Sequence, residues 1–548
     1  MKKTRLLTSA ALAGVLAAGG LLPLGPHKGA QAAQRTSTPT RGGTVIDGLY
    51  EEPDKLIPNT STETFGRMVQ KTIFSPLFYT DDKGVLHAGL ASEIPSTSNG
   101  GISNGGKTYT FHLRPGLVWS DGQPLDARDV DYSWRTWMNK DLIVAGTIGF
   151  DQIQSASVSS DKLSITFHLK GSYAPFIGAW TDDVYPMPAH VFKQYSAKGL
   201  NTSPFTFKPT VSSGPFIIQS RKAGDNITEV RNPHYYQSGK PYLDKLIFRI
   251  IPDQVALTNA LQAHEVDCAW FLSISAINTL QHISGYKLVA GVAPNIEQGL
   301  LNLHNPILQD VRVRQALEYG LNRQAMVSDV WHGNAVLMAS DEAPSLFSYT
   351  SSVKPYAFDP KKAAQLLDAA GWKLQGGVRM KNGKPLALRW TTTAKNPWRR
   401  QDQLIAQQNY ADLGVKLTLV NYPADTYFGQ TLPKGDFDIG EFENNFAYDP
   451  GLVVAQYFSS TQFAPHGSNY GYYGSSTYDN LIHQQEQTAD VQQRKAIFAK
   501  MQAVMNRDVP ALWLYDPPNL AEYSLKLHNY APGPFSNETW NTADWYKS

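Results

Sequence analysis

The stretch Thr108–Trp134, TYTFHLRPGLVWSDGQPLDARDVDYSW, has the clearest structural pattern in the chain. Residues 109–113 alternate between apolar and polar, which predicts a half-buried strand. Asp121-Gly122 indicates a tight turn, because glycine accepts positive φ without a Cβ clash. Asp126, followed by Asp129 three residues later, predicts a capped helix start. The stretch therefore predicts a strand, two turns and a helix.

The composition indicates a folded chain with more than one domain. Its 548 residues exceed what one hydrophobic core usually holds. A hydrophobic content of 42% and a charged content of 18% are typical of folded proteins. Strands that alternate with helices along the chain favour α/β sheets. Aromatic residues reach 11%; most fit ordinary core and surface positions, and a minority is available to line a ligand cavity.

Residues 1–32 have the pattern of a secretory signal peptide. A basic start precedes an apolar stretch over 6–24, and Ala30-Gln31-Ala32 is a small-residue cleavage site. Removing 1–32 removes four basic residues and no acidic residue, so the formal charge changes from +2 to −2. Such a near-neutral chain has no electrostatic footprint for nucleic acid. No later segment approaches about 18 consecutive apolar residues, so the mature chain is expected to be soluble.

The residue order of 108–134, and that of 300–323, resembles the family 5 extracellular solute-binding proteins. These are the oligopeptide- and dipeptide-binding subunits of ABC importers. The resemblance spans nearly all of residues 42–546. It implies an α/β, two-lobed periplasmic-binding-protein-like fold of the class II type, with an extra small subdomain in the first lobe.

The resemblance also implies how the chain is divided, because the first lobe of such proteins is discontinuous. The expected parts are a signal peptide (1–32), a flexible tether (33–41), a first lobe (42–75, 211–292 and 519–548), a small subdomain (76–210) and a second lobe (293–518).

The function implied by the resemblance is ligand capture without catalysis. Two hinged lobes would close on an oligopeptide and deliver it to ABC permease subunits in the membrane, while a separate subunit hydrolyses ATP. The expected state is a monomer in the periplasm or at the outer cell surface, with no cofactor and no metal. Cys268 is the single cysteine, so an internal disulfide and a Cys-rich zinc site are excluded. No cysteine lies near the cleavage site, so a lipoprotein anchor is not expected.

Catalytic motifs are weak in this chain. Gly101–Gly105 matches G-x-S-x-G, but a nucleophile elbow needs a buried strand before the serine and a helix after it. Here a Gly/Ser/Asn loop precedes Ser103 and a strand follows. H-E-x-x-H, Walker A and G-x-G-x-x-G motifs do not occur. We therefore expect no enzyme activity.

The polar run Phe442–Gly451, FENNFAYDPG, follows an apolar strand expected at 437–442, and such positions often bind ligands in α/β folds. Two interpretations of Asp449 remain open. It is suited to cap the helix that Pro450 opens. The resemblance implies instead that it pairs with a peptide's α-ammonium group, in which case Asp449→Asn would weaken binding and change folding little.

Four aromatic residues are further candidates for the ligand site: Tyr50, Trp398, Phe446 and Tyr515. Trp398 precedes a helix expected at 404–413. Dipeptide-binding relatives place an arginine before this helix, but residues 393–396 read TAKN and contain none, which favours longer or different ligands.

Several alternatives stay open. The same fold in related proteins binds oligosaccharides, opines or nickel complexes. Outside the family, the alternatives are a secreted hydrolase and a sensor that reports peptides without transport. The hydrolase requires a nucleophile or a metal set, whereas a neighbouring permease gene would favour transport.

Overall fold

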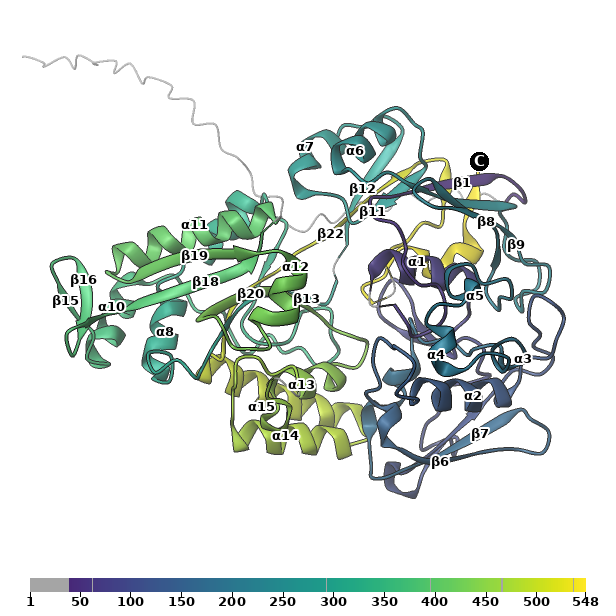
Figure 1. The fold of residues 1–548 in the computed structure, drawn as a ribbon, viewed down its shortest axis with the longest axis horizontal. Helices are drawn as coiled ribbons and strands as arrows, with labels where there is room; N and C mark the ends of the chain where they lie inside the picture. Colours follow the sequence, from purple (N-terminus) through teal and green to yellow (C-terminus); the bar gives the residue numbers. More distant parts are fainter. Residues whose placement is uncertain (1–38, 62, 292, 395, 465–466, 536) are drawn as a thin grey trace, which may run out of the picture. The chain divides into compact units, whose positions relative to one another are not determined.

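The computed structural model describes residues 39–548 except 62, 292, 395, 465–466 and 536 (Figure 1). Residues 40–548 form one compact unit. The predicted signal peptide, 1–32, and most of the predicted tether, 33–41, lie outside the described residues. Within the described part, no helix is both long and apolar enough to span a membrane.

The larger of two main sheets has the strand order β12-β22-β11-β1-β10-β9-β8. Its strands are β1 (Thr44–Leu49), β8 (Phe216–Lys222), β9 (Asn226–Arg231), β10 (Lys245–Ile250), β11 (Cys268–Trp270), β12 (Tyr286–Gly291) and β22 (Asn519–Ser524). The central strand β1 runs parallel to both β10 and β11. We call this sheet the first sheet; its strands come from three distant stretches of the chain.

The second sheet has the order β14-β21-β13-β20-β18-β19. Its strands are β13 (Asn295–Leu301), β14 (Val336–Leu337), β18 (Ala387–Thr393), β19 (Lys416–Tyr422), β20 (Ile439–Asn445) and β21 (Ala511–Asp516). Every residue of β13 is buried. Apolar residues of this sheet and its helices form a core cluster that includes Trp390, Tyr410 and Leu512.

A four-stranded antiparallel sheet, with the order β4-β5-β7-β6, lies in the region between β1 and β8 along the chain. Its strands are β4 (Ile102–Ser103), β5 (Thr108–His112), β6 (Ile153–Val158) and β7 (Ser164–Leu169). Smaller ladders contain β2 (Phe78–Thr80), β3 (Leu86–Ala88), β15 (Lys373–Gln375), β16 (Val378–Lys381), β17 (Lys384–Pro385), β23 (Leu527–His528) and β24 (Tyr546–Lys547).

The helices cover and connect these sheets. The longer ones are α1 (Thr64–Ile73), α2 (Ala127–Trp137), α6 (Gln254–Gln262), α8 (Val311–Tyr319), α10 (Pro360–Ala369), α11 (Pro397–Asp412), α13 (Gly451–Phe458), α14 (Ser476–Gln487) and α15 (Val491–Asp508). Short helices are α3 (Ala189–Phe192), α4 (Ala197–Leu200), α5 (Pro204–Phe207), α7 (Ile277–Leu280), α9 (Arg323–Ala325) and α12 (Ala424–Thr426).

The capped helix predicted after Asp126 is confirmed. The backbone N–H of Arg128 donates to Asp126 Oδ1 at 2.9 Å, and the backbone N–H of Asp126 donates to Asp129 Oδ2 at 3.1 Å. These reciprocal bonds form a capping box, which satisfies N–H groups that have no partner inside α2.

The helix expected at 404–413 is wrong at its start, because α11 begins at Pro397. Asn396 caps it, accepting from the backbone N–H of Arg399 at 3.2 Å. Polar residues of its first turns, including Asp402 and Gln403, are buried against the sheet, so an apolar periodicity does not reveal them. Similarly, β20 extends to Asn445, beyond the strand expected at 437–442.

Two short crossings connect the first and second sheets. β12 ends at Gly291 and β13 begins at Asn295, while β21 ends at Asp516 and β22 begins at Asn519. β12 pairs with β22 and β13 pairs with β21, both antiparallel. The two crossing segments therefore join the same two pairs of strands.

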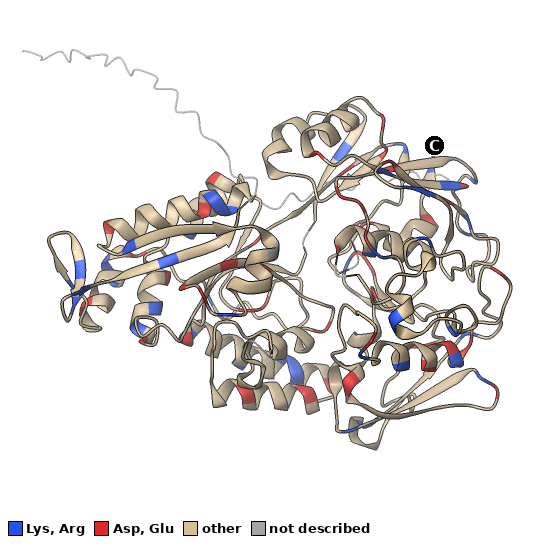
Figure 2. Ribbon diagram, in the orientation of Figure 1, with Lys and Arg blue, Asp and Glu red and all other residues tan. Residues whose placement is uncertain are grey.

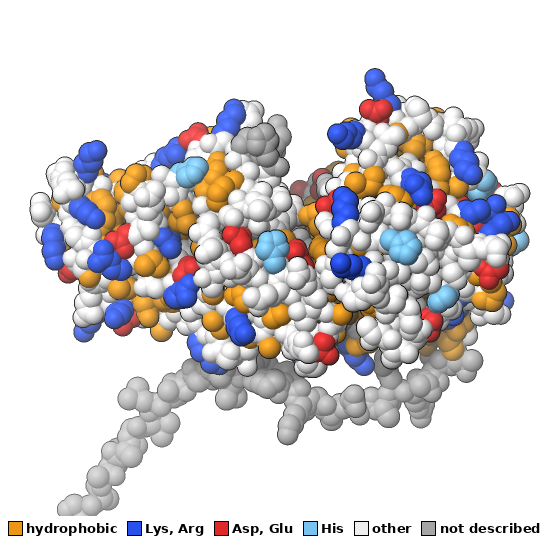
Figure 3. Space-filling model, turned by 90° about the horizontal axis from the view of Figure 1, so that it is seen from below, with side chains coloured by type: hydrophobic (Ala, Val, Ile, Leu, Met, Phe, Trp, Pro, Cys, Tyr) orange, Lys and Arg blue, Asp and Glu red, His pale blue; other side chains and the backbone are white. Residues whose placement is uncertain are grey.

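The G-x-S-x-G match does not form a nucleophile elbow. Ser103 is exposed and ends the two-residue strand β4, which precedes a short 3₁₀ turn, Asn104–Gly106, rather than an α-helix. Charges of both signs share the same helices (Figure 2), and the face in Figure 3 shows no broad patch of one sign. This distribution agrees with the near-neutral charge of the sequence after residue 32.

Several carboxyl groups are buried in the sheets without a cation. Asp516, at the end of β21, is 4% exposed, and neither of its side-chain oxygens has a hydrogen-bond partner among the described residues. Burial, with a smaller contribution from nearby Glu443, raises the pKa of Asp516 from its ordinary 3.8 to about 9. Burial likewise raises the pKa of Glu522 on β22 to about 8.

These buried acids predict a protein that is more stable in mild acid. The contribution of Asp516 is complete below its unfolded pKa of 3.8 and is lost as the pH rises toward about 9, because only the unfolded chain ionises freely in that window. The free energy of unfolding changes by about 1.4 kcal/mol per pH unit for one such group. Asp516 therefore accounts for a loss of up to about 4 kcal/mol of this free energy between about pH 5 and about pH 8. Urea unfolding across this pH range should show that Asp516→Asn loses less free energy of unfolding than the wild type does. The exposed control Glu93→Gln should keep the wild-type slope; equal slopes for both variants would contradict the prediction.

Candidate functional site

A cavity of about 410 Å³ lies between residues that belong to the first sheet, the second sheet and the region 145–184. Its lining includes both crossings, through Ala293, Pro294, Asn295 and Asn519. On the side of the second sheet it is lined by Asn445, Phe446, Ala447 and Tyr448, which follow or end β20. We call this cavity the cleft.

Amide and aromatic side chains dominate the chemistry of the cleft. The amides are Asn59, Asn295, Asn445, Asn519 and Asn537, and the aromatic residues are Phe150, Trp270, Phe271, Phe446, Tyr448 and Phe535. An amide side chain both donates and accepts, so it can pair with either group of a peptide bond. Aromatic faces give apolar contact to ligand side chains of different shapes.

The charged residues at the cleft compensate one another. Asp183 lies 3.1 Å from Lys71 Nζ and 3.7 Å from Arg67 Nη1. Burial alone would raise the pKa of Asp183, but Lys71 and Arg67 lower it below its usual value. Asp182 Oδ1 accepts from the backbone N–H and the hydroxyl of Thr80, both at 2.9 Å. These contacts hold the acidic pair in place before any ligand arrives.

Four lining residues other than glycine have left-handed backbone conformations. They are Asn59 (φ 56°), Asp182 (φ 52°), Phe271 (φ 62°) and Asn537 (φ 49°). Such conformations cost about 1–3 kcal/mol each when they are strained, and they concentrate at functional sites. For Phe271, which has no short polar side chain to support the conformation, the inference of a functional constraint is strongest.

Asp449 is 4% exposed and pairs with Arg494 rather than facing the cavity. Arg494 donates to Asp449 Oδ2 at 2.6 Å and to Oδ1 at 2.8 Å, and the backbone N–H of Gly451 donates to Oδ1 at 2.9 Å. Asp449 lies one residue before Pro450, the residue at the N-cap of α13, and accepts from the first N–H of that helix, so it supports the helix start without occupying the N-cap position itself. Its pairing with a ligand ammonium group stays a prediction. Because Asp449→Asn would remove the counterion of Arg494, the buried pair now favours a loss of stability for this variant.

Of the other predicted site residues, Phe446 lines the cleft and three do not. Tyr50 is half-buried and packs on Phe65 with ring centroids 4.8 Å apart. Tyr515 is fully buried, and its hydroxyl donates to Asp402. Trp398 packs edge-on against Trp331, with centroids 5.9 Å apart.

Arg399, which lies in the first turn of α11 rather than before the helix, has a structural role here. Arg399 donates to Glu297 at 2.8 and 3.0 Å, and both residues are buried between α11 and the second sheet. Lys395 lies outside the described residues, and Arg400 is exposed. The glutamate partner on β13 could not be read from the sequence, because the two residues are 102 positions apart.

Most residues that line the cleft could not be predicted from the sequence. The asparagines of the cleft come from loops and strand ends, and nothing in their immediate sequence distinguishes them from turn residues. The two that adopt left-handed conformations, Asn59 and Asn537, match only the general tolerance of asparagine for that region. The residues that line the cleft come from distant parts of the chain, and no local sequence pattern shows that these parts meet.

The two-sheet α/β fold and the cleft at its crossings define the class of solute-binding proteins, and comparisons with known proteins agree. Residues 86–465 match the family model described as bacterial extracellular solute-binding proteins, family 5 Middle. The chain belongs to this family, so the family predicted from the sequence is confirmed.

Individual relatives match over most of their lengths. The oligopeptide-binding protein AppA of Bacillus subtilis is 26% identical over 523 residues, covering 94% of this chain and 93% of AppA. The dipeptide-binding protein of Escherichia coli is 26% identical over 431 residues, covering 75% of this chain and 78% of the relative. Both are named as binding proteins.

Solved structures confirm the predicted α/β fold class. AppA of Bacillus subtilis, in complex with a nonapeptide, aligns with a TM-score of 0.78 at 25% identity, covering 93% of this chain and all of AppA. NikZ of Campylobacter jejuni, in complex with Ni(L-His), aligns with a TM-score of 0.78 at 23% identity, covering 92% of this chain and 99% of NikZ. At 23% identity, the similarity to NikZ shows a shared fold and says nothing about the ligand of this chain.

The Asp449–Arg494 pair predicts a large effect on stability. Removing one member of a buried ion pair leaves the other charge unpaired and costs about 3–5 kcal/mol. Asp449→Asn and Arg494→Met should each lower the free energy of unfolding by about this amount in urea titrations. The double variant should lose less free energy of unfolding than the two single variants lose when their losses are added. Arg507→Met, which removes an exposed pair with Asp508, should cost about 1 kcal/mol or less. Equal small effects at all sites would contradict the buried-pair assignment.

Proposed function

We propose that this chain is the substrate-binding protein of an ABC importer, which captures oligopeptides in the cleft and delivers them to permease subunits in the membrane. The observation that supports this proposal is the cleft. Residues of both sheets line it at the two crossings that the described residues contain. Family membership and the peptide-binding relatives support the choice of transport over sensing or hydrolysis.

The lining supports a peptide as the ligand. Its asparagine side chains can pair with peptide N–H and C=O groups, and its aromatic residues can accept varied side chains. A volume of about 410 Å³ lies toward the lower end of the range of about 300–1,000 Å³ for small-ligand pockets. In this conformation the cleft suits a short peptide or one end of a longer one.

The proposal includes the division into lobes and the route of the protein. The first lobe comprises 42–75, 211–292 and 519–548, the small subdomain 76–210 and the second lobe 293–518. The lobes close by bending at the two crossings. Residues 1–32 direct export and are removed, and the monomeric protein acts outside the cytoplasmic membrane.

Peptide binding can be tested directly. Native mass spectrometry of the protein purified from its source should detect a retained peptide, and calorimetric titration with a tri- to pentapeptide mixture should detect binding. A bound mass that matches a sugar, an opine or a nickel complex, without any peptide binding, would overturn the peptide assignment and retain the family assignment.

Phe446 gives a residue-level prediction, because it is the one predicted site residue on the cleft wall. Phe446→Ala should weaken peptide binding about tenfold or more, which corresponds to about 1.4 kcal/mol. Phe358→Ala is the matched control, since Phe358 is 44% exposed and does not line the cleft. Circular dichroism should show that both variants fold. Unchanged affinity for folded Phe446→Ala would remove Phe446 from the site.

The role of Asp449 can be separated by a double-mutant cycle. Wild type and Asp449→Asn are each titrated with a free and an N-acetylated peptide. Because Arg494 already neutralises Asp449, we expect the effects of acetylation and substitution to be additive. A coupling of more than about 1 kcal/mol would show that Asp449 contacts the peptide's ammonium group.

A further inference from the structure

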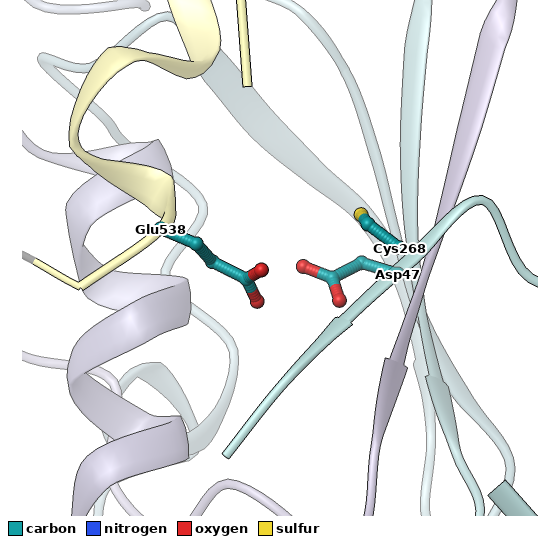
Figure 4. A group of neighbouring side chains, drawn as sticks. All are labelled: Asp47, Cys268 and Glu538. Carbon is teal, nitrogen blue, oxygen red and sulfur yellow. The ribbon is translucent and has the colours of Figure 1, made fainter. Parts of the chain in front are cut away.

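Three buried side chains from distant parts of the chain converge beneath the first sheet. Asp47 lies on β1 and Cys268 on β11, and the two are partners in the parallel ladder. Glu538, from the C-terminal segment, points toward them from the opposite side (Figure 4). The three are fully buried, and one ligand atom from each lies within 4.8 Å of the others.

The carboxylates in this cluster lack the partners that burial demands. Outside the cluster, neither oxygen of Asp47 has a hydrogen-bond partner among the described residues, and Glu538 Oε1 has none there either. Within the cluster, Asp47 lies within hydrogen-bonding reach of Glu538 and Cys268. Tyr530 donates only to Glu538 Oε2. The ion pairs of the described chain place no Lys, Arg or His on Asp47 or Glu538; Lys547, for example, pairs with Asp267 at 2.8 Å. An ionised carboxylate in such a place costs several kcal/mol unless a cation compensates it.

We propose that Asp47, Cys268 and Glu538 bind a divalent metal ion of the zinc type. Two carboxylates and one thiolate form a mixed oxygen and sulfur donor set. The sulfur favours zinc over calcium or magnesium, which prefer oxygen ligands. Zinc takes four ligands, and coordination by both oxygens of Asp47 would complete the set with these three residues.

The site is distinct from the cleft and serves the fold. None of the three residues lines the cavity. The ion would join β1, β11 and the segment that follows β22, so it would fix the C-terminal segment to the centre of the first sheet. Metal binding to such a site adds directly to the free energy of unfolding, because the unfolded chain does not preform it.

Protons compete with the ion. Burial raises the pKa of Asp47 well above its ordinary value, and Glu538 raises it further; burial also raises the pKa of the Cys268 thiol. Zinc binds a cysteine as the thiolate and a carboxyl group as the carboxylate, so its binding releases the protons that these groups carry. A cluster that merely shares a proton gains no stability from zinc.

The test uses the full mature chain. Protein unfolded in urea with EDTA is refolded with zinc or with EDTA, since a buried site exchanges ions slowly. After gel filtration, elemental mass spectrometry should find one zinc ion per chain. The zinc-refolded protein should have a higher thermal midpoint than the EDTA-refolded protein. Refolding with cobalt should produce the near-ultraviolet absorption of a thiolate–cobalt bond.

Isosteric variants locate the ion. Cys268→Ser should abolish the cobalt–thiolate absorption, and Asp47→Asn should weaken zinc binding by more than the about 10- to 100-fold that the loss of an outer partner costs. Glu229→Gln is the matched control, because Glu229 is equally buried on β9 of the same sheet but lies outside the cluster. It should keep full zinc binding.

Two outcomes would overturn the proposal. In one, wild-type protein contains no zinc and shows equal midpoints with zinc and EDTA, which identifies a carboxyl pair that shares a proton. In the other, folded Cys268→Ser and Asp47→Asn bind zinc as wild type does, which places the ion elsewhere. Peptide binding is measured separately, so either outcome leaves the proposed function intact.

Discussion

The two crossings between the sheets are the constraint on which the rest of the structure depends. In the sequence, residues 292–294 separate β12 from β13, and residues 517–518 separate β21 from β22. Three of these five residues are Pro294, Pro517 and Pro518, which have no backbone N–H and a restricted φ. The strand ladder therefore cannot continue through these prolines. The closure proposed above would bend the chain at the crossings, and residues of both crossings line the cleft.

In the second sheet, buried polar side chains stabilise the fold. Under α11, Arg399 and Glu297 form a buried pair, Trp390 donates to Glu441 at 2.8 Å, and Tyr515 donates to Asp402. Burial raises the pKa of Asp402 to about 8. These acidic and basic residues are of types that often act in catalysis, but here they hold α11 against the second sheet, away from the cleft. The cleft itself relies on uncharged amides and on acids that are already paired, which suits reversible capture better than bond breaking.

Local rules predicted local structure well and distant structure poorly. The capping box of α2 follows from contacts within a few residues, so the sequence was sufficient to predict it. The start of α11 was missed because its buried face is polar. Phe446 directly follows β20 and lines the cleft, whereas Asp449 pairs with Arg494, which is 45 positions away in the sequence. Four left-handed residues at the cleft depend on tertiary packing that no short motif encodes.

The position of the last strands has a consequence for the timing of assembly. β21 lies between β14 and β13, and β22 lies between β12 and β11, so residues 511–524 complete both sheets. Until those residues are present, β12 is not joined to the rest of the first sheet and β14 is not joined to the rest of the second, and long-range pairings of this kind form slowly. The cleft is lined by Asn519 and by residues 534, 535 and 537, so it also is complete only when the end of the chain is in place. In the export proposed above, a chain that crosses the membrane from its N-terminus would therefore acquire its binding site last.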